Sequence, residues 1–230
     1  MPHDDDLSAD HVVALPLDEL ALRVLADFKA TGGWNWRNWL VEREQGVYQG
    51  RPDALRALSE AWGWIIARGL VARTISQSSA EAVTVSRLGE EVLRRGAPYL
   101  RAVQRLDVAL LPELEAQARP QFLRGDFEAA AFMAMKEVEV AVREAGDFDP
   151  SLVGTKLMQE AFKPGGPLHQ AELDPGESVA TMELFKGAIG LFKNPSSHRR
   201  VDFSDPTEAA EVVLLADLLL RVLQRSQKGK

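Results

Sequence analysis

The stretch DFEAAAFMAMKEVEVAVRE, residues 126–144, indicates the fold class of this chain. Small and apolar side chains recur along it at intervals of three and four residues, the spacing of one face of an α-helix. That inward stripe consists of Phe127, Ala130, Ala134, Val138 and Ala141. Lys136, Glu139 and Arg143 recur on another face, where we expect a solvated ladder of charges. The stretch therefore predicts one helix of a helical bundle.

The composition of the chain restricts the class of protein to which this helix can belong. The chain has 230 residues, of which 46% are hydrophobic and 27% charged, as in an average globular protein with room for two modest domains. It has no cysteine, which excludes disulfide frameworks, thiolate metal sites and cysteine nucleophiles. The acidic start, MPHDDDLSAD, lacks the apolar core of a secretory signal. The longest apolar run, residues 212–223, is too short to span a bilayer. We expect a cytoplasmic protein without a membrane partner, preceded by a flexible leader over residues 1–14.

The charge distribution leaves a nucleic-acid partner open. The net charge of −7 argues against such a partner, but residues 186–200 contain lysine and arginine and no acid. Local basic segments matter more for phosphate binding than the sum over the chain.

Residues 15–96 predict a first domain of mixed secondary structure. An amphipathic helix over residues 17–28 stops at Thr31-Gly32-Gly33, Asn35 caps a short second helix, and Pro52 opens a third that ends at Gly69. Two β-prone runs, residues 70–75 and 82–85, then predict a hairpin, and a helix follows over residues 87–95. This order is typical of a winged helix-turn-helix. Its third helix would enter a DNA groove, but that helix is apolar, so a protein-binding module on the same scaffold is the alternative.

Residues 97–230 predict helices alone. We expect them over residues 99–117, from residue 122 to Gly125, over residues 126–144, and from Asp149-Pro150 to about Lys163. Two more begin at Asp174-Pro175-Gly176-Glu177 and Asp205-Pro206-Thr207-Glu208, because each places Asp at the N-cap and Pro directly after it. The first of these carries an inward face of Val179, Met182, Phe185, Ile189 and Phe192. The last is apolar nearly all round, so one side faces its own bundle and the other a second subunit.

The segment Lys193-Asn194-Pro195-Ser196-Ser197-His198 carries the densest chemistry. The preceding helix ends near Lys193, because a residue that precedes proline is pushed out of the helical region. Metal-free RNA cleavage needs a base of near-neutral pKa, which His198 offers. It also needs a fixed cation, here Lys193, and a group that orients the phosphate, a task open to Asn194 and Ser197. The sequence offers no carboxylate cluster or histidine pair at ligand spacing, so we expect no metal and no cofactor.

From about residue 111 to residue 223 the chain resembles the HEPN superfamily, and within it the Ymh-type prokaryotic branch. The matching stretches are GDFEAA at residues 125–130, KEVEVAVRE at 136–144, LMQEAF at 157–162 and FKGAIG at 185–190, which runs into residues 193–198. The resemblance implies an antiparallel bundle of four to five helices that forms homodimers. It also implies an endoribonuclease, a hydrolase used in toxin–antitoxin or antiviral defence systems, with RNA as its partner.

The superfamily's signature is an arginine, a polar residue, a short spacer and a histidine. His198 matches the histidine and Asn194 the polar residue, whereas Lys193 stands where the arginine is expected. Lysine keeps the charge but lacks the bidentate fork of arginine. The resemblance thus makes these three the candidate catalytic residues. The candidate nucleic-acid contacts beside them are Lys186, Ser197, Arg199 and Arg200.

Two other functions remain open. One is a non-catalytic regulator, in which residues 15–96 bind DNA or another nucleic acid and residues 97–230 form the dimer. The other is an interaction module of a defence complex, in which residues 15–96 bind a protein.

Overall fold

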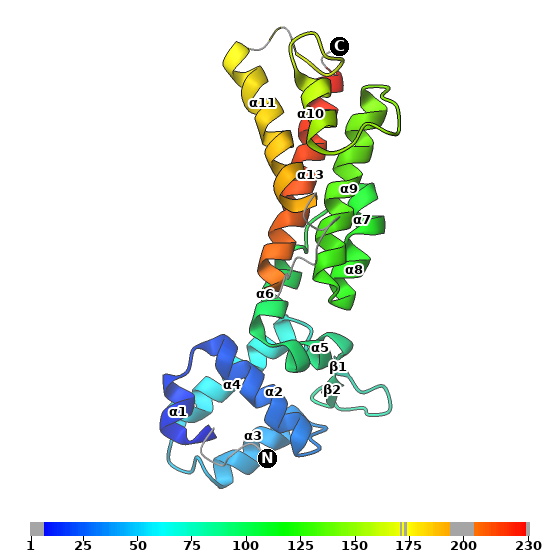
Figure 1. The fold of residues 1–230 in the computed structure, drawn as a ribbon. Helices are drawn as coiled ribbons and strands as arrows, with labels where there is room; N and C mark the ends of the chain where they lie inside the picture. Colours follow the sequence, from blue (N-terminus) through cyan, green and yellow to red (C-terminus); the bar gives the residue numbers. More distant parts are fainter. Residues whose placement is uncertain (1–6, 171, 173, 194–204, 229–230) are drawn as a thin grey trace. The chain divides into compact units, whose positions relative to one another are not determined.

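The computed structural model describes residues 7–170, 172, 174–193 and 205–228. The chain forms two compact units, Met1–Leu100 and Arg101–Lys230. The sequence predicts a boundary between residues 96 and 97, and the two units divide after Leu100. Both units are mainly helical (Figure 1), which confirms the predicted mainly α class. Each helix in the described ranges is too short or too polar to cross a membrane.

In the first unit, helices precede and follow a short antiparallel hairpin. The elements in chain order are α1 (Ala9–Ala14), α2 (Leu17–Ala30), α3 (Trp36–Gln45), α4 (Pro52–Ala67), β1 (Val71–Arg73), β2 (Val83–Val85) and α5 (Arg87–Arg95). Val71 pairs with Val85 in the hairpin, and an isolated bridge pairs Asn35 with Ala82. The Asn35 side chain also caps α3, because it accepts the backbone N–H of Asn38 at 3.0 Å. This element order agrees with the one predicted for residues 17–95.

Aromatic side chains fill the core of the first unit. Trp62 on α4 meets Phe28 of α2 edge-on, with ring centroids 4.9 Å apart, and meets Trp39 of α3 at 5.7 Å. The indole N–H of Trp39 donates to the Asp27 carboxylate at 2.9 Å. Edge-to-face contacts of this kind add stability beyond the area that the rings bury. The tryptophans of α3 and α4 therefore hold the two helices against α2.

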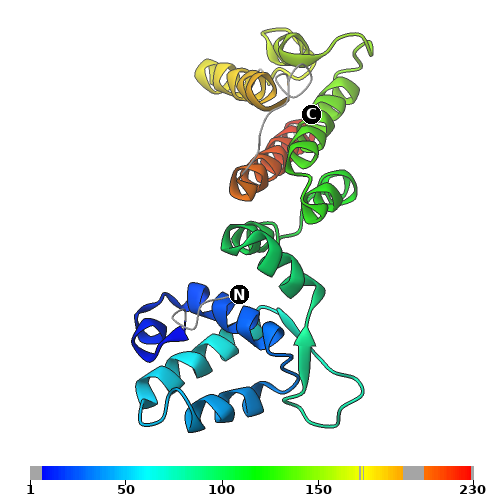
Figure 2. The same ribbon diagram turned by 60° about the horizontal axis from the view of Figure 1, so that its bottom comes forward.

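The second unit is a helical bundle. Its elements are α6 (Ala97–Arg105), which crosses the division between the units, α7 (Pro112–Gln117), α8 (Arg119–Arg124), α9 (Phe127–Ala145), α10 (Gly154–Phe162), α11 (Pro175–Ala188), the π-helical turn η2 (Ile189–Lys193) and α13 (Pro206–Lys228). Helices α9 and α13 lie side by side (Figures 1 and 2) and form the most extensive contact in the unit. The two predicted caps are confirmed, since Asp174 accepts the N–H of Gly176 and Asp205 accepts that of Thr207.

Two of the predicted helix boundaries are wrong. The chain is not helical from residue 99 to residue 117, because Pro112 lacks the N–H that a helix interior needs and instead begins α7. The helix expected from Asp149 begins only at Gly154. Gly154 has a φ of +65°, outside the right-handed helical region, so a helix cannot run through it from Asp149.

The predicted inward face of α11 is also wrong at one position. Phe185 and Ile189 are buried as expected, but Val179 is 51% exposed. The first turns of α11 therefore present part of their apolar face to the surface, whereas its last turn and η2 pack into the bundle core.

Candidate functional site

The end of α11 places Lys193 through an unusual turn. The helix passes into the π-helical turn η2, whose last residue is Lys193. Gly190 in this turn lies close to α10, since a Cβ atom on it would stand 3.2 Å from Cγ2 of Thr155. A Cβ atom on Gly187, in contrast, would meet nothing within 4 Å. Single π-turns inside helices occur often at functional sites.

The Lys193 side chain contacts a buried carboxylate, that of Glu139. The Lys193 ammonium lies 3.3 Å from Oε2 of Glu139 on α9, and the two side chains are 15% and 6% exposed. Arg143, one turn later on α9, donates to Oε1 of Glu139 at 2.8 Å. The backbone N–H of Gly154 donates to Oε2 at 2.7 Å. One carboxylate therefore joins α9, the start of α10 and the end of η2. We call Glu139, Arg143 and Lys193 the Glu139 cluster.

The Glu139 carboxylate keeps its charge. Burial raises the pKa of Glu139, but the N–H of Gly154 and the cations of Arg143 and Lys193 together outweigh burial, so the pKa lies below its ordinary value. Glu139 is therefore ionised at neutral pH. Glu139 thus has two cations as partners at the point where the chain enters the predicted catalytic segment.

The prediction that the charged residues of α9 lie in solvent is wrong at Glu139. Lys136 is exposed as expected, but Glu139 is buried and Arg143 is half-buried. A local signal for this burial existed in the sequence. Glu139 follows Met135 and Val138 on the buried stripe that continues to Val142. An acid on such a stripe needs a partner, and its partners Gly154 and Lys193 come from later segments, which the periodicity of α9 does not reveal.

The remaining predicted site residues divide into two groups. Lys186 on α11 donates to Glu183 of the same helix at 2.8 Å and is not part of the Glu139 cluster. The others lie outside the described residues: Asn194, Ser197, His198, Arg199 and Arg200. Of the three predicted catalytic residues, the structure therefore places Lys193.

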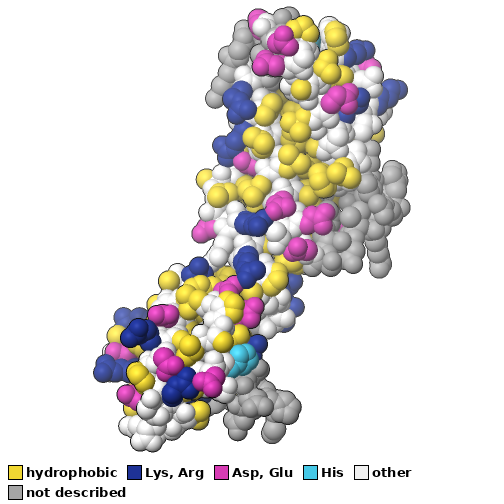
Figure 3. Space-filling model, turned by 90° about the vertical axis from the view of Figure 1, so that its left-hand side faces the viewer, with side chains coloured by type: hydrophobic (Ala, Val, Ile, Leu, Met, Phe, Trp, Pro, Cys, Tyr) yellow, Lys and Arg dark blue, Asp and Glu magenta, His cyan; other side chains and the backbone are white. Residues whose placement is uncertain are grey.

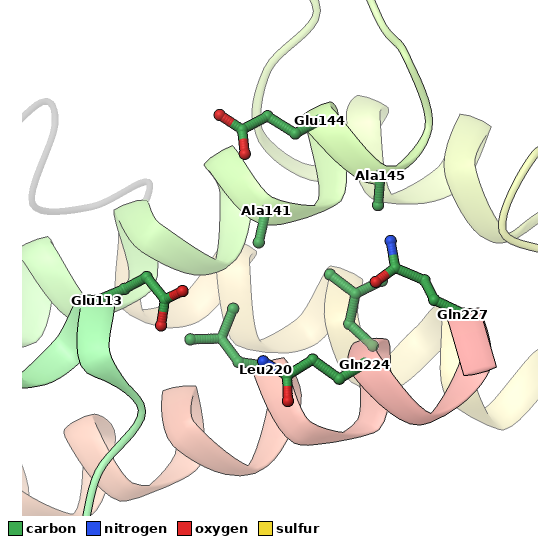
Figure 4. Close-up of a pocket in the computed structure, with 8 residues that line it drawn as sticks. Glu113, Ala141, Glu144, Ala145, Leu220, Gln224 and Gln227 are labelled. Atoms are coloured by element: carbon green, nitrogen blue, oxygen red, sulfur yellow. The ribbon is translucent and has the colours of Figure 1, made fainter.

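An acidic groove lies elsewhere on the bundle, among α7, α9 and α13 (Figure 4). Its volume is about 330 Å³, and its rim includes Glu113, Glu144 and the side-chain amides of Gln224 and Gln227. Ala141 and Ala145 form its floor on α9 (Figure 4). Nearby, burial and then the charges of Glu113 and Glu144 raise the pKa of Glu137. Carboxylates of this density repel phosphate, so this groove is not the expected RNA site.

Hydrophobic side chains gather on the face of the second unit that Figure 3 presents, where α11 and α13 lie. The large hydrophobic residues most exposed on α11, η2 and α13 are Val179, Leu184, Leu191 and Leu218. Leu191, the most exposed of them at 65%, is two residues from Lys193. An apolar surface of this kind is typical of an interface with another protein chain. We call the surface of Leu191 on η2 and Leu218 on α13 the α11–α13 apolar face.

Residues 109–223 match a family model described as "Protein of unknown function (Hypoth_ymh)". The matched region contains the Glu139 cluster and residues 194–198, and it begins after the first unit has ended. This match confirms the Ymh-type part of the resemblance. The chain matches no curated protein and no solved structure.

Proposed function

The chain belongs to the Hypoth_ymh family of proteins of unknown function, and we propose that it is a metal-independent endoribonuclease of HEPN type. The observation that carries this proposal is the buried ion pair between Lys193 and Glu139. It fixes a cation at the residue directly before Asn194, at the start of a segment that also holds His198. A charge that is already oriented stabilises a transition state without the cost of reorganising solvent.

In the reaction that we propose, His198 takes the proton from a ribose 2′-hydroxyl. The 2′-oxygen forms a bond to phosphorus, and the bond from phosphorus to the 5′-oxygen breaks. Water gives a proton to the leaving 5′-oxygen, and His198 returns its proton to the solvent. The products are an RNA end with a 2′,3′-cyclic phosphate and a second end with a 5′-hydroxyl. The roles proposed for Lys193 and Asn194 are to stabilise the charge on the phosphate oxygens.

The Glu139 cluster supports the proposal that Lys193 takes the role of the arginine in the superfamily signature. Lysine is flexible, and a free lysine would have to be ordered when substrate binds. Here the Glu139 carboxylate orders the Lys193 side chain before substrate arrives. Arg143 pairs with the same carboxylate, so Lys193 shares Glu139 with a second cation. A positive charge at low exposure attracts phosphate more strongly than the same charge in open solvent.

We also propose that the α11–α13 apolar face joins two copies of the chain. Such a homodimer brings two copies of Lys193 near one interface, because Leu191 on this face is two residues from Lys193. Two positive sites near each other bind the phosphates of one RNA strand more tightly than either does alone.

The first unit is assigned a recognition role. The order α2, α3, α4, β1 and β2, with the added bridge from Asn35 to Ala82, supports a winged helix-turn-helix. This observation also favours the second candidate function, a regulator in which the first unit binds DNA or a protein and the bundle only dimerises. The two functions differ in whether RNA is cut.

RNA cleavage in EDTA tests the proposed function. Purified full-length protein is incubated with single-stranded and structured RNA, beside a His198→Ala variant and a His11→Ala control from the first unit. We expect the wild type and the control to cut RNA and His198→Ala to lose at least about 10²-fold in rate. Equal rates in all three proteins, or no cleavage by any, would instead favour the regulator.

A further inference from the structure

The π-helical turn η2 contacts α9, α10 and α11 within its five residues. Ile189 at its start is buried in the bundle core, and Lys193 at its end is paired with Glu139 of α9. Between them, Gly190 lies against α10, where a Cβ atom on it would stand 3.2 Å from Cγ2 of Thr155. One helical turn therefore carries both the contact with α10 and the contact with the carboxylate.

These contacts form a closed ring through three elements. Thr155, which adjoins Gly190, directly follows Gly154 at the start of α10. The backbone N–H of Gly154 donates to Oε2 of Glu139 at 2.7 Å, and the Lys193 ammonium lies 3.3 Å from the same oxygen. The ring runs from η2 to α10, from α10 to α9, and from α9 back to η2. A shift of η2 away from α10 therefore also moves Lys193 relative to Glu139.

The start of α10 is the fixed side of this ring. The Arg143 side chain of α9 donates to the Leu152 carbonyl at 3.2 Å, which ties the segment before α10 to α9. Leu157 and Met158 in the first turns of α10 are fully buried in the core. In contrast, η2 is a single turn in which Leu191 is exposed. Because a packed core has little free space, a larger side chain at position 190 displaces η2 rather than α10.

Two glycines allow this contact to be separated from helix propensity. Gly187 on α11 and Gly190 on η2 both lie in helical turns, and neither has a positive φ. Alanine favours a helix at either position, because glycine is the weaker helix former. A Cβ atom on Gly187 would meet nothing within 4 Å, whereas one on Gly190 would approach Thr155 more closely than the optimal carbon separation of about 3.5–4.0 Å. Gly187→Ala is therefore the matched control for Gly190→Ala.

We propose that Gly190 and Thr155 are positioning residues, whose close packing brings η2 near enough to α9 for the Lys193 ammonium to reach Glu139. A side chain at position 190 holds η2 away from α10 and separates the ion pair. This role rests on the proposed function, in which Lys193 is the fixed cation. The ion pair itself exists without RNA, so the positioning and the RNA cleavage have separate readouts.

The energetic coupling between Lys193 and Glu139 measures whether the ring is closed. Lys193→Met, Glu139→Gln and the variant with both changes are made in the full-length protein, and urea unfolding is followed by circular dichroism. In the wild type we expect a coupling of roughly tenfold in the unfolding equilibrium constant. The same cycle is then measured with Gly190→Ala, where we expect less than about twofold, and with Gly187→Ala, where we expect the wild-type value. A general loss of stability cancels in such a cycle.

A methyl group moved across the contact tests the geometry. Thr155→Ser removes the Cγ2 methyl that a Cβ atom at position 190 would meet, and it keeps the hydroxyl. We expect Gly190→Ala combined with Thr155→Ser to regain most of the coupling, because one methyl group then takes the place of the other. RNA cleavage should fall about tenfold or more in Gly190→Ala, return in the combined variant and stay unchanged in Gly187→Ala.

Three results would overturn the proposed positioning. They are a wild type without coupling between Lys193 and Glu139, an undiminished coupling in Gly190→Ala, and a loss in Gly190→Ala that Thr155→Ser does not restore. The expected pattern of coupling in a protein that does not cut RNA would support the positioning and refute the endoribonuclease.

Discussion

The Lys193 ammonium lies 3.3 Å from the carboxylate of Glu139, and this pair ties the end of η2 to the middle of α9. Arg143 and the backbone N–H of Gly154 complete the coordination of the carboxylate. Removing one member of such a buried group leaves the others without compensation, which costs more than the pair itself contributes. The contact therefore fixes both the fold of the bundle and the start of the segment that we propose to be catalytic.

The first prediction concerns the stability of the second unit. Glu139→Ala leaves the Arg143 and Lys193 cations without a counter-charge, and we expect it to lower the free energy of unfolding by roughly 3 kcal/mol. Glu139→Gln keeps an acceptor oxygen and should cost less. Urea unfolding followed by circular dichroism measures both. All five tryptophans lie between residues 34 and 64, so their fluorescence reports the first unit and should not change.

The same carboxylate predicts a dependence of stability on pH. The pKa of Glu139 is lowered in the folded protein relative to the unfolded chain, where it is about 4.3. Its contribution is therefore complete above pH about 4.3 and is lost as the pH falls through the lower folded-state pKa. Glu139→Gln lacks this contribution, so between neutral and acidic pH its free energy of unfolding should fall less than that of the wild type. Parallel slopes in the two proteins would contradict the lowered pKa.

The second prediction separates charge from anchoring at Lys193. Lys193→Met keeps a similar length without charge, and we expect it to lower the RNA cleavage rate about 10²–10³-fold. Lys193→Arg keeps the charge and restores the fork of the family signature, and it should stay within about tenfold of the wild type. Single-turnover rates measure the effect. Equal rates in Lys193→Met and the wild type would show that the cation has no part in the reaction.

The third prediction tests the α11–α13 apolar face as the dimer interface. Leu191→Glu combined with Leu218→Glu places two charges per chain on this face, each where an apolar side chain would be buried. We expect the dissociation constant of the dimer to rise at least about 100-fold, which sedimentation equilibrium measures. Ile75→Glu, at a fully exposed position in the first unit, is the matched control and should leave the dimer intact. A wild type that stays monomeric at all concentrations would refute the interface.

The fourth prediction concerns the cap of α9. The Asp126 side chain accepts the backbone N–H of Ala129, and Asp126→Ala should lower the free energy of unfolding by about 1 kcal/mol. Asp126→Asn keeps the acceptor and should stay within a few tenths of a kcal/mol. Urea unfolding of the two variants beside the wild type checks the difference, and an equal loss in both would show that the negative charge of Asp126, not its acceptor oxygen, stabilises the helix start.

Local signals allowed the sequence to predict most helix starts. Asn35, Asp174 and Asp205 lie where a capping residue belongs, and each accepts a backbone N–H in the structure. A cap depends only on the next few residues, so the sequence contains the whole interaction. The same reasoning failed at the helix expected over residues 99–117, where the amphipathic pattern outweighed the effect of Pro112.

The contacts of the site depend on segments far apart in the chain. From the sequence alone, Glu139 is one of several charged residues on α9. Its burial is explained by its contacts with Gly154 and Lys193, which belong to later segments of the chain. From the sequence alone, Val179 is expected in the core. Phe185 of α11 and Ile189 of η2 pack into the core instead and set how the helix is rotated against the bundle. Helical periodicity predicts that a face exists, and packing between helices decides which part of that face is covered.

The end groups of cleaved RNA test the central claim most directly. The full-length protein is incubated with a labelled RNA in EDTA, beside the His198→Ala variant, and the product ends are identified by mass spectrometry. The proposed reaction gives a 2′,3′-cyclic phosphate and a 5′-hydroxyl in the wild type alone. Products with a 3′-hydroxyl and a 5′-phosphate, or identical products from both proteins, would contradict an endoribonuclease that works through Lys193 and His198.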